Sequence, residues 1–177
     1  MRKGVKLLPR NYIDIFQVCI RFILNRKFGV GSYKLIIAGS YRREATKSGD
    51  VDVLITSTNF TLNDMVSELQ KWNIITDEVL SMRDQKFMGI GHCPNGGWFY
   101  FRIDIEFLPI EEFASGLLYF TGSKEFNVKM RQDAKNKGFK LSEHGLFRID
   151  TGERILVYTE EEIFQVLNLE YVEPKKR

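Results

Sequence analysis

The sequence predicts an α+β protein in which a mixed β-sheet with helices precedes a smaller, mainly helical part that carries a β-hairpin. Two observations support this prediction. Across the first 110 residues, short apolar runs typical of strands alternate with apolar residues at helical spacing. After Pro109 the spacing is helical up to about residue 137. Because 177 residues suffice for two small domains, we expect one part over 1–110 and a second over 111–177.

The expected elements of the first part follow from its apolar spacing and its turn residues. A helix begins after Pro9 and ends at Gly29, because apolar residues recur every three or four positions between them. A second helix covers 62–72, with Thr61 as its N-cap. The sequence Asn95-Gly96-Gly97 favours a tight turn. The expected strands cover 33–38, 51–56, 74–80, 86–92 and 98–108.

The second part is expected to hold two consecutive helices, a hairpin and a final helix. Gly122 separates the first two helices, Ser123 is the expected N-cap of the second, and Gly138 closes it. The remaining expected elements are a hairpin formed by 146–149 and 154–157, a helix over 160–167 capped by Thr159, and a frayed polar tail over 173–177.

The charge of the chain is unevenly distributed. Residues 1–110 carry 15 basic and 11 acidic side chains, whereas residues 111–177 carry 11 and 12. If some acids of the first part bind metal ions, their charge is neutralised, and the surface of this part is more basic than the count of side chains indicates. A basic surface is compatible with nucleic-acid binding. No apolar run approaches the roughly 20 residues that span a bilayer, so no membrane association is expected. Two cysteines cannot form a disulfide framework, which favours an intracellular protein of the cytoplasm or nucleus.

The most informative segment is 39–52, which connects two apolar strands. Asp50 and Asp52 begin the second strand and share one of its faces, because side chains alternate along a strand. Two carboxylates this close repel each other unless a cation lies between them, and Mg²⁺ prefers such oxygen ligands. Backbone N–H groups of the Gly-Ser turn, with Arg42 and Arg43, are suited to bind phosphate. The segment therefore predicts metal-dependent nucleotidyl transfer.

A third carboxylate strengthens this interpretation. Asp104 and Glu106 alternate with apolar residues on a strand that is otherwise expected to be buried. Acids on a sheet face are costly to bury unless they are paired or bind metal. If this strand lies beside the first acidic strand, either residue completes a three-carboxylate site for two Mg²⁺ ions. The simpler alternative is a pair of solvated acids at the start of a strand.

Six segments of the sequence match one polymerase family in order and spacing. They are Gly39-Ser40-Tyr41-Arg42-Arg43, Ser48-Gly49-Asp50-Val51-Asp52-Val53-Leu54, Lys86-Phe87-Met88-Gly89, Arg102-Ile103-Asp104-Ile105, Tyr119-Phe120-Thr121-Gly122-Ser123 and Glu173-Pro174-Lys175. On these residues the chain resembles the catalytic part of a family X DNA polymerase, the family of DNA polymerase beta. The resemblance extends from about Leu8 to the C-terminus. It implies a nucleotidyltransferase palm over 1–110 and a nucleotide- and template-binding thumb over 111–177.

The resemblance also implies roles for particular side chains. Asp50 and Asp52 would bridge two Mg²⁺ ions, for which Mn²⁺ can substitute, and the third catalytic and metal-binding acid would be Asp104 rather than Glu106. The residues implied in nucleotide binding are Gly39, Ser40, Arg43, Ser48, Gly49, Tyr119, Phe120, Gly122 and Asn127. The residues implied in DNA binding are Arg102, Lys124, Arg131, Lys135, Lys137, Glu143 and His144.

Several of these side chains have a simpler structural interpretation. Tyr119 and Phe120 on a helix are commonly core residues, although the Thr-Gly-Ser that follows them favours a functional turn. Arg131 and the lysines after it are also typical of a solvated helix face. His144 is equally typical of a surface residue.

The function implied by the resemblance is DNA-directed DNA synthesis into short gaps during base excision repair. A primer 3′-hydroxyl would attack a dNTP and release pyrophosphate. The implied partners are gapped or nicked primer–template DNA, a dNTP and a DNA ligase, with the protein as a monomer. Two alternatives remain open: template-independent or non-DNA nucleotidyl transfer with the same fold, and a non-catalytic gap-binding protein.

The sequence differs from most of this family before the palm and at two positions. It shows no lysine-rich lyase domain and no helix-hairpin-helix pair, so it resembles the minimal palm–thumb form known from African swine fever virus. This implies a viral repair polymerase of the virion or viral factory, with a piece of a longer polymerase as the alternative. Glu106 stands where DNA polymerase beta has an arginine that can pair with a metal-binding aspartate, so we expect Asp52 to lack that partner. Lys124 replaces an acid and is expected to strengthen the attraction of dNTP.

Overall fold

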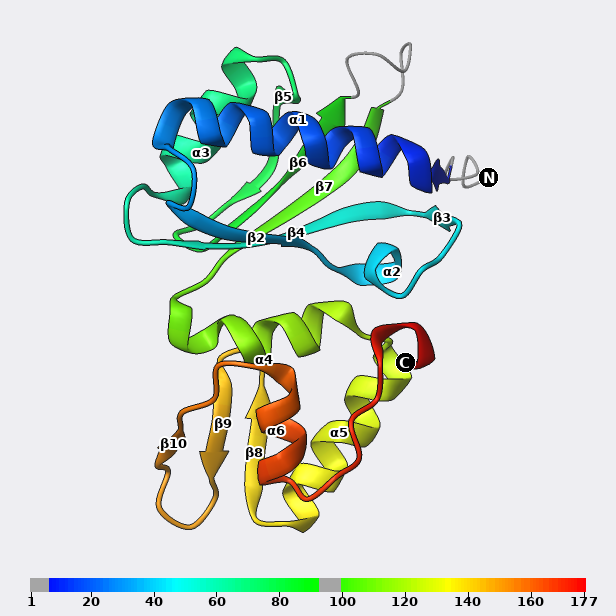
Figure 1. Cartoon of the computed structure of the whole chain (residues 1–177), viewed down its shortest axis with the longest axis vertical. Helices are drawn as coiled ribbons and strands as arrows, with labels where there is room; N and C mark the ends of the chain where they lie inside the picture. Colours follow the sequence, from blue (N-terminus) through cyan, green and yellow to red (C-terminus); the bar gives the residue numbers. More distant parts are fainter. Residues whose placement is uncertain (1–6, 93–99) are drawn as a thin grey trace.

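A computed structural model describes residues 7–92 and 100–177 of the 177-residue chain. Figure 1 shows a β-sheet with helices above a smaller group of helices and short strands, so the expected α+β class is confirmed. The predicted turn at 95–97 lies outside the described residues, as does the beginning of the strand predicted over 98–108. Among the described residues, no helix is both long and apolar enough to cross a membrane.

Within the described residues, five strands form the main sheet. They are β2 (Tyr33–Ile37), β4 (Asp50–Ser57), β5 (Ile75–Met82), β6 (Lys86–His92) and β7 (Tyr100–Phe107). In space their order is β2-β4-β7-β6-β5. The pair β4–β7 is parallel and the other neighbouring strands are antiparallel, so the sheet is mixed as predicted.

Helices α1 (Arg10–Phe28) and α3 (Leu62–Lys71) cover one face of this sheet, and Figure 1 shows α1 lying across its strands. The apolar stripe of α1 is buried as its spacing predicts. Thr61 begins α3 as predicted, and its side chain accepts a hydrogen bond from the backbone of the first turn. Val53 and its alternate neighbours along β4 join both helices in the largest buried cluster.

The other face of the sheet turns toward the C-terminal part of the chain. Helix α4 (Ile110–Thr121) packs on this face, where Leu54 of β4 is buried against Phe113 and Leu117. Asp52 lies on the same face, two residues before Leu54. The carboxylates of β4 therefore point toward the junction of the two parts. Because α4 also contributes to the buried cluster of the C-terminal part, the division at residue 110 stays a prediction.

The segment between β2 and β4 differs from the simple turn that the sequence predicted. Its first residues form a short helix, α2 (Gly39–Arg42), and a two-residue strand, β3 (Lys47–Ser48), pairs with β1 (Leu8–Pro9). Gly39 has a φ of 57°, in the left-handed region that glycine adopts most easily. These elements escaped prediction because each is too short to show a periodic pattern.

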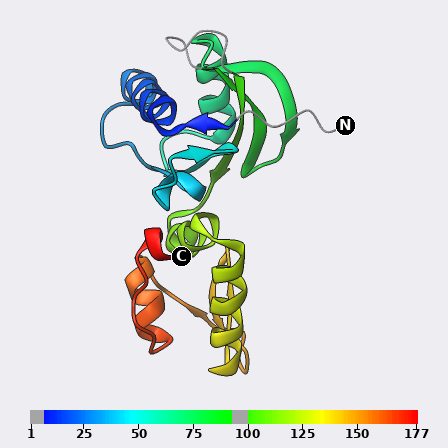
Figure 2. The same cartoon turned by 90° about the vertical axis from the view of Figure 1, so that its right-hand side faces the viewer.

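The C-terminal part combines helices with a small antiparallel sheet, and Figure 2 shows it meeting the main sheet along α4. The predicted hairpin exists, but β8 adds a strand that was not predicted, because four residues after Gly138 show no clear alternation. Ser123 caps α5 as predicted, since its Oγ accepts a hydrogen bond from the backbone N–H of Phe126. The elements after α4 are α5 (Lys124–Asn136), β8 (Phe139–Ser142), β9 (Gly145–Arg148), β10 (Arg154–Ile155), α6 (Glu160–Val166) and the 3₁₀-helix η1 (Pro174–Lys176).

The C-terminal tail packs around a buried arginine, so the expected fraying is wrong. The side chain of Arg177 has 0% exposure. Its Nη1 donates to Glu160 Oε1 at 2.6 Å, and its Nε donates to the backbone carbonyl of Val172 at 2.8 Å. The guanidinium also lies 5.2 Å and 5.8 Å from the ring centroids of Phe126 and Phe164. The contacts of the Arg177 side chain thus hold the tail in place, although its polar composition predicted fraying.

Candidate active site

Two strands of the main sheet bring three aspartates to one place. In the parallel pair β4–β7, Asp52 lies opposite Asp104, and Asp50 lies opposite Arg102. The three acids share a face, because side chains two residues apart on a strand point the same way. The register also shows that Asp104, and not Glu106, is level with Asp52.

Gly39 allows the carboxyl group of Asp52 to lie against the backbone of α2. A Cβ atom at position 39 would lie 2.0 Å from Asp52 Oδ2, so any side chain there would displace this carboxyl group. The backbone N–H of Ala38 donates to the carbonyl of Asp52 at 2.8 Å, so the two segments are fixed against each other. The glycine is thus required by the position of this carboxylate as well as by its own φ.

The carboxyl group of Asp52 lies in a buried and acidic environment. Burial raises the pKa of Asp52 to about 7, and the charges of Asp50 and Asp104 are further causes. Arg102 and Lys86 act on this pKa in the opposite direction but do not cancel the increase. Carboxylates that repel each other in this way fit a divalent cation with oxygen ligands, of which Mg²⁺ is the best suited to phosphate chemistry.

Both carboxylate oxygens of Asp104 are bound by Arg102. Arg102 Nε donates to Asp104 Oδ1 at 2.9 Å, and its Nη2 donates to Oδ2 at 2.7 Å. In the part of the chain that the structure describes, no three acidic, histidine or cysteine side chains are therefore arranged to hold an ion as they stand. Asp52 forms no ion pair among these residues.

The residues predicted to bind phosphate lie beside Asp52, along α2 and β3. Ser40 Oγ donates to Ser48 Oγ at 2.8 Å, so the two hydroxyl groups are adjacent. Arg43 Nη1 donates to the backbone carbonyl of Thr121 at 2.5 Å and thereby ties the end of α2 to the end of α4. Gly49 is exposed between β3 and β4. These residues form one edge of the site.

Arg42 does not face the phosphate-binding edge, contrary to our expectation. Its Nη1 and Nη2 donate to Glu160 Oε1 and Oε2 at 2.9 Å and 2.6 Å, and Nη1 also donates to Thr121 Oγ1 at 2.7 Å. Burial acts to raise the pKa of Glu160, but hydrogen bonds from Arg42 and Arg177 outweigh it and lower that pKa. The cluster of Arg42, Glu160 and Arg177 therefore joins α2 to α6 and to the C-terminus.

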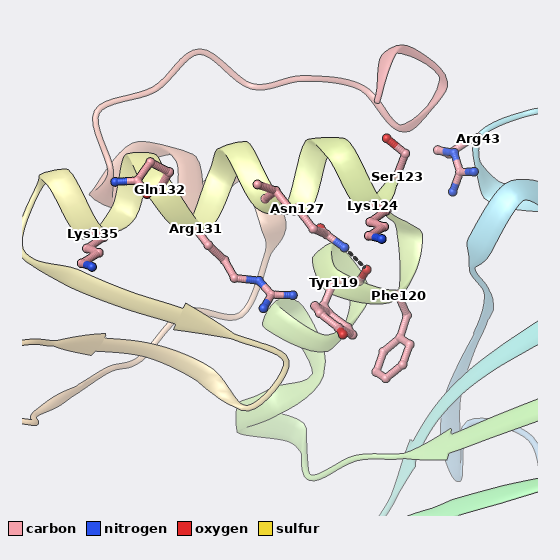
Figure 3. Close-up of a pocket in the computed structure, with 11 residues that line it drawn as sticks. Arg43, Tyr119, Phe120, Ser123, Lys124, Asn127, Arg131, Gln132 and Lys135 are labelled. Atoms are coloured by element: carbon pink, nitrogen blue, oxygen red, sulfur yellow. Dashed lines mark hydrogen bonds between the residues drawn. The ribbon is translucent and has the colours of Figure 1, made fainter.

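A cleft of about 740 Å³ lies at the junction of the two parts, next to α2. Figure 3 shows that its side chains come from the end of α4, from α5 and from the residue that follows α2. The structure brings together here most residues predicted from the second part. The predicted nucleotide- or DNA-binding residues that line it are Arg43, Tyr119, Phe120, Gly122, Lys124, Asn127, Arg131 and Lys135.

Contacts from α5 hold the aromatic wall of this cleft in place. Asn127 Nδ2 donates to the backbone carbonyl of Tyr119 at 2.7 Å, as Figure 3 shows. The guanidinium of Arg131 lies 4.9 Å from the ring centroid of Tyr119. The rings of Tyr119 and Phe120 meet edge to face with their centroids 5.0 Å apart. Both aromatic residues are half-buried and line the cleft.

The remaining residues predicted to contact DNA lie in three different places. Glu143 and His144 line a second cleft, of about 550 Å³, which shares the two aromatic side chains with the first. His144 Nδ1 lies 3.0 Å from Glu112 Oε2, so the imidazole faces a carboxylate. Arg102 is half exposed and holds Asp104. Lys137 follows the last turn of α5 and lines neither cleft.

Sequence reasoning missed the residues that act through long-range contacts. Glu160 was expected only as the first residue of the helix capped by Thr159. It is instead buried between Arg42 and Arg177. Lys86 was noticed only as part of a matching segment, yet it forms an ion pair with Glu106 on the face that carries the aspartates. No local pattern distinguishes such residues, because their partners are distant in the sequence.

Comparison with known protein families accounts for both parts of the chain. The family model of the DNA polymerase beta palm matches residues 8–110. The family model of the DNA polymerase beta thumb matches residues 116–177. Together the two models cover the main sheet, the aspartates, both clefts and the C-terminal cluster.

Individual relatives are also DNA polymerases. The chain is 37% identical over 161 residues to DNA polymerase lambda of Rattus norvegicus, which covers 80% of this chain and 28% of that protein. It is 38% identical over 86 residues to the DNA-directed DNA/RNA polymerase mu of Homo sapiens, and this match covers 48% of this chain and 17% of that protein. It is 44% identical over 78 residues to DNA polymerase IV of Saccharomyces cerevisiae, and this match covers 43% of this chain and 13% of that protein. The chain thus spans less than a third of the length of each of these relatives.

Proposed function

The chain belongs to the family of DNA polymerase beta, and from this premise we propose that it is a DNA-directed DNA polymerase that fills short gaps during repair. In the proposed reaction, the oxygen of a primer 3′-hydroxyl attacks the α-phosphorus of a dNTP. The bond to the β-phosphate breaks, and pyrophosphate leaves with the electron pair. The viral source implied by the minimal palm–thumb form stays a prediction.

The register of Asp52 and Asp104 is the observation that supports this proposal most strongly. It sets carboxylates of two neighbouring strands level with each other, on the sheet face against which α4 packs. Catalysis of phosphoryl transfer depends mainly on positioning and on neutralising charge, which such a site provides. When bound, two Mg²⁺ ions, or Mn²⁺ in their place, would neutralise charge on the attacking and leaving oxygens.

Each aspartate has its own part in the proposed mechanism. Asp50 and Asp52 would hold the cations, with Gly39 leaving the space that the second carboxylate needs. Asp104, once it has left Arg102, would hold one cation. Its carboxylate would also accept the hydrogen bond of the primer hydroxyl as the proton leaves.

The cleft supplies the contacts to the incoming nucleotide. Arg43, with the hydroxyls of Ser40 and Ser48, is suited to hold the triphosphate, because guanidinium and hydroxyl groups match phosphate oxygens. Tyr119 forms a wall close to the sugar, and Asn127 holds that wall from α5. The basic side chains of α5 that line the same cleft are suited to the template strand.

The partners we propose follow from this reaction. They are gapped or nicked primer–template DNA, a dNTP, and a DNA ligase that seals the filled gap, with the polymerase acting as a monomer. Phosphate contacts by lysine and arginine dominate such DNA binding, so it should fall steeply with salt concentration.

The test is incorporation of labelled dNTP with Mg²⁺, comparing a one-nucleotide gap, an open primer–template and a primer without template. We expect the nucleotide complementary to the template to be added, with the gap as the best substrate. Equal addition to the untemplated primer would instead favour template-independent transfer. Binding of gapped DNA without any incorporation would favour the non-catalytic alternative.

A further inference from the structure

Lys86 and Glu106 face each other across β6 and β7, next to a candidate metal ligand. Lys86 is the register partner of Glu106, and Met88 is the partner of Asp104. The ammonium of Lys86 forms an ion pair with Glu106 Oε1. Because residues two apart on a strand share a face, this pair lies on the same face as Asp104 and Asp52.

Glu106 depends on Lys86 because it is buried. The residue is 8% exposed, and burial raises its pKa, with the charges of Asp104 and Glu143 acting in the same direction. The hydrogen bond and the charge of Lys86 oppose this increase. Among the described residues, Lys86 is the one cation that forms an ion pair with Glu106. Removal of Lys86 would leave the buried Glu106 carboxylate without its cation.

Lys86 also contacts the groups on which the proposed reaction depends. Its Nζ lies 5.8 Å from the ring centroid of Phe120, which lines both clefts. Its strand register also puts it on the sheet face that carries Asp104 and Asp52. The position of this ammonium therefore affects both the aromatic wall of the nucleotide cleft and the electrostatics of the carboxylates.

Asp104 is the alternative partner for Lys86. In an antiparallel pair, a long side chain can reach the diagonal neighbour on the facing strand, and Asp104 is the diagonal neighbour of Lys86. Arg102 already holds Asp104 from the other direction. A lysine released from Glu106 would add a second cation beside Asp104 and would compete with divalent cations for its oxygens.

We propose that Glu106 is a positioning residue of the active site, which holds the Lys86 ammonium beneath Phe120 and away from Asp104 so that the aspartates stay available to divalent cations. This inference rests on the proposed metal-dependent nucleotidyl transfer. It gives Glu106 a role without metal ligation or contact with DNA, and it explains why a carboxylate occupies the buried position opposite a lysine.

The test is a double-mutant cycle in which Mn²⁺ binding to the DNA-free protein is measured by electron paramagnetic resonance. Glu106→Met releases Lys86 and should raise the Kd for Mn²⁺ by about tenfold, because an unpaired cation then lies beside Asp104. In a Lys86→Met background, the same Glu106→Met change should move the Kd by less than about twofold, since no cation is released. Asp84→Asn is the matched control, because it removes an exposed carboxylate from the same cleft without releasing a lysine.

Equal losses of Mn²⁺ affinity in the two backgrounds would overturn the inference, because a simple loss of negative charge acts regardless of Lys86. A loss of Mn²⁺ affinity in Asp84→Asn as large as the loss in Glu106→Met would overturn it as well. Circular dichroism verifies that each variant is folded, and Glu106→Gln, which keeps the side-chain shape, replaces Glu106→Met if that variant unfolds. Coupling in the Mn²⁺ cycle together with absence of dNTP incorporation by the unsubstituted protein would overturn the proposed polymerase function but not this inference.

Discussion

Arg102 holds both carboxylate oxygens of Asp104, two residues further along the same strand, at 2.9 Å and 2.7 Å. On the neighbouring strand, Asp52 lies opposite Asp104 and has no such partner among the described residues. One candidate metal ligand is therefore bound by an arginine while the others repel each other. We infer that release of Asp104 from Arg102 completes the metal site.

Removal of the competing guanidinium should favour metal binding. We expect Arg102→Gln to lower the Kd for Mn²⁺ by about threefold, a modest effect because about half of the Arg102 side chain is exposed and solvent screens its charge. Arg148→Gln, in the sheet of the C-terminal part, is the control for a lost arginine. Titration at low ionic strength measures both, and an unchanged Kd for Arg102→Gln would show that this ion pair does not compete with metal.

The close approach of Gly39 to Asp52 predicts a severe effect of the smallest side chain. Gly39→Ala would place its Cβ 2.0 Å from Asp52 Oδ2, so we expect displacement of that carboxylate and at least about a hundredfold loss of kcat. Gly29→Ala is the matched control, because Gly29 has a φ of 92° and a Cβ added there would meet no atom within 4 Å. It should lower stability by about 1 kcal/mol and leave kcat unchanged. Similar kcat values for both variants would contradict this account of Gly39.

The cluster of Arg42, Glu160 and Arg177 predicts a pH dependence of stability. Glu160→Gln leaves two arginines without their shared carboxylate and should reduce the free energy of unfolding by about 3 kcal/mol at pH 7. The pKa of Glu160 is lowered from 4.5 in the folded state, so its contribution is present above pH 4.5 and is lost as the pH falls below that value. Urea unfolding at pH 7, 5 and 3.5 should therefore show the two proteins converging in acid. A constant difference across this range would exclude an ionised Glu160 as the cause.

The position of Lys124 in the nucleotide cleft predicts an electrostatic contribution to dNTP binding. Lys124→Asp should weaken dNTP binding by about fivefold at low salt, and the difference should shrink as added salt screens the charge. Lys137→Asp makes the same change just after the other end of α5, outside the cleft, and it should have little effect. Fluorescence titration with dNTP at several salt concentrations separates the two cases. Equal effects of both substitutions would mean that only the net charge matters.

Local patterns were sufficient to predict much of the fold and of the site. The spacing of apolar residues predicted α1 and the strands of the main sheet, and the cap residues Thr61 and Ser123 begin helices as expected. Asp50 and Asp52 could be assigned to one face because alternation along a strand is a local property. The resemblance to family X polymerases, rather than a local pattern, implied that the aromatic pair before Gly122 binds nucleotide, and this pair lines the cleft.

What escaped prediction depends on contacts between distant residues. Whether Asp104 lies opposite Asp52 depends on the register of two strands that are about fifty residues apart in the sequence. The sequence of each strand does not determine this register, so Asp104 and Glu106 remained alternatives. Arg42 looked equivalent to Arg43 until Glu160 was seen to bind it. Arg177 lies in a polar tail, and only the packed structure shows that its guanidinium is buried. Short elements such as β8 offered too few residues for a pattern.

The most direct test of the account is the rate of templated nucleotide addition by Asp104→Asn, measured in a single turnover on a one-nucleotide gap with Mg²⁺. Asp77→Asn, an exposed acid on the edge strand β5, is the control. We predict a loss of at least about a thousandfold for Asp104→Asn, with gapped-DNA affinity within about twofold of the unsubstituted protein. The control should keep the full rate. Addition by Asp104→Asn at the rate of the control would contradict the three-aspartate site.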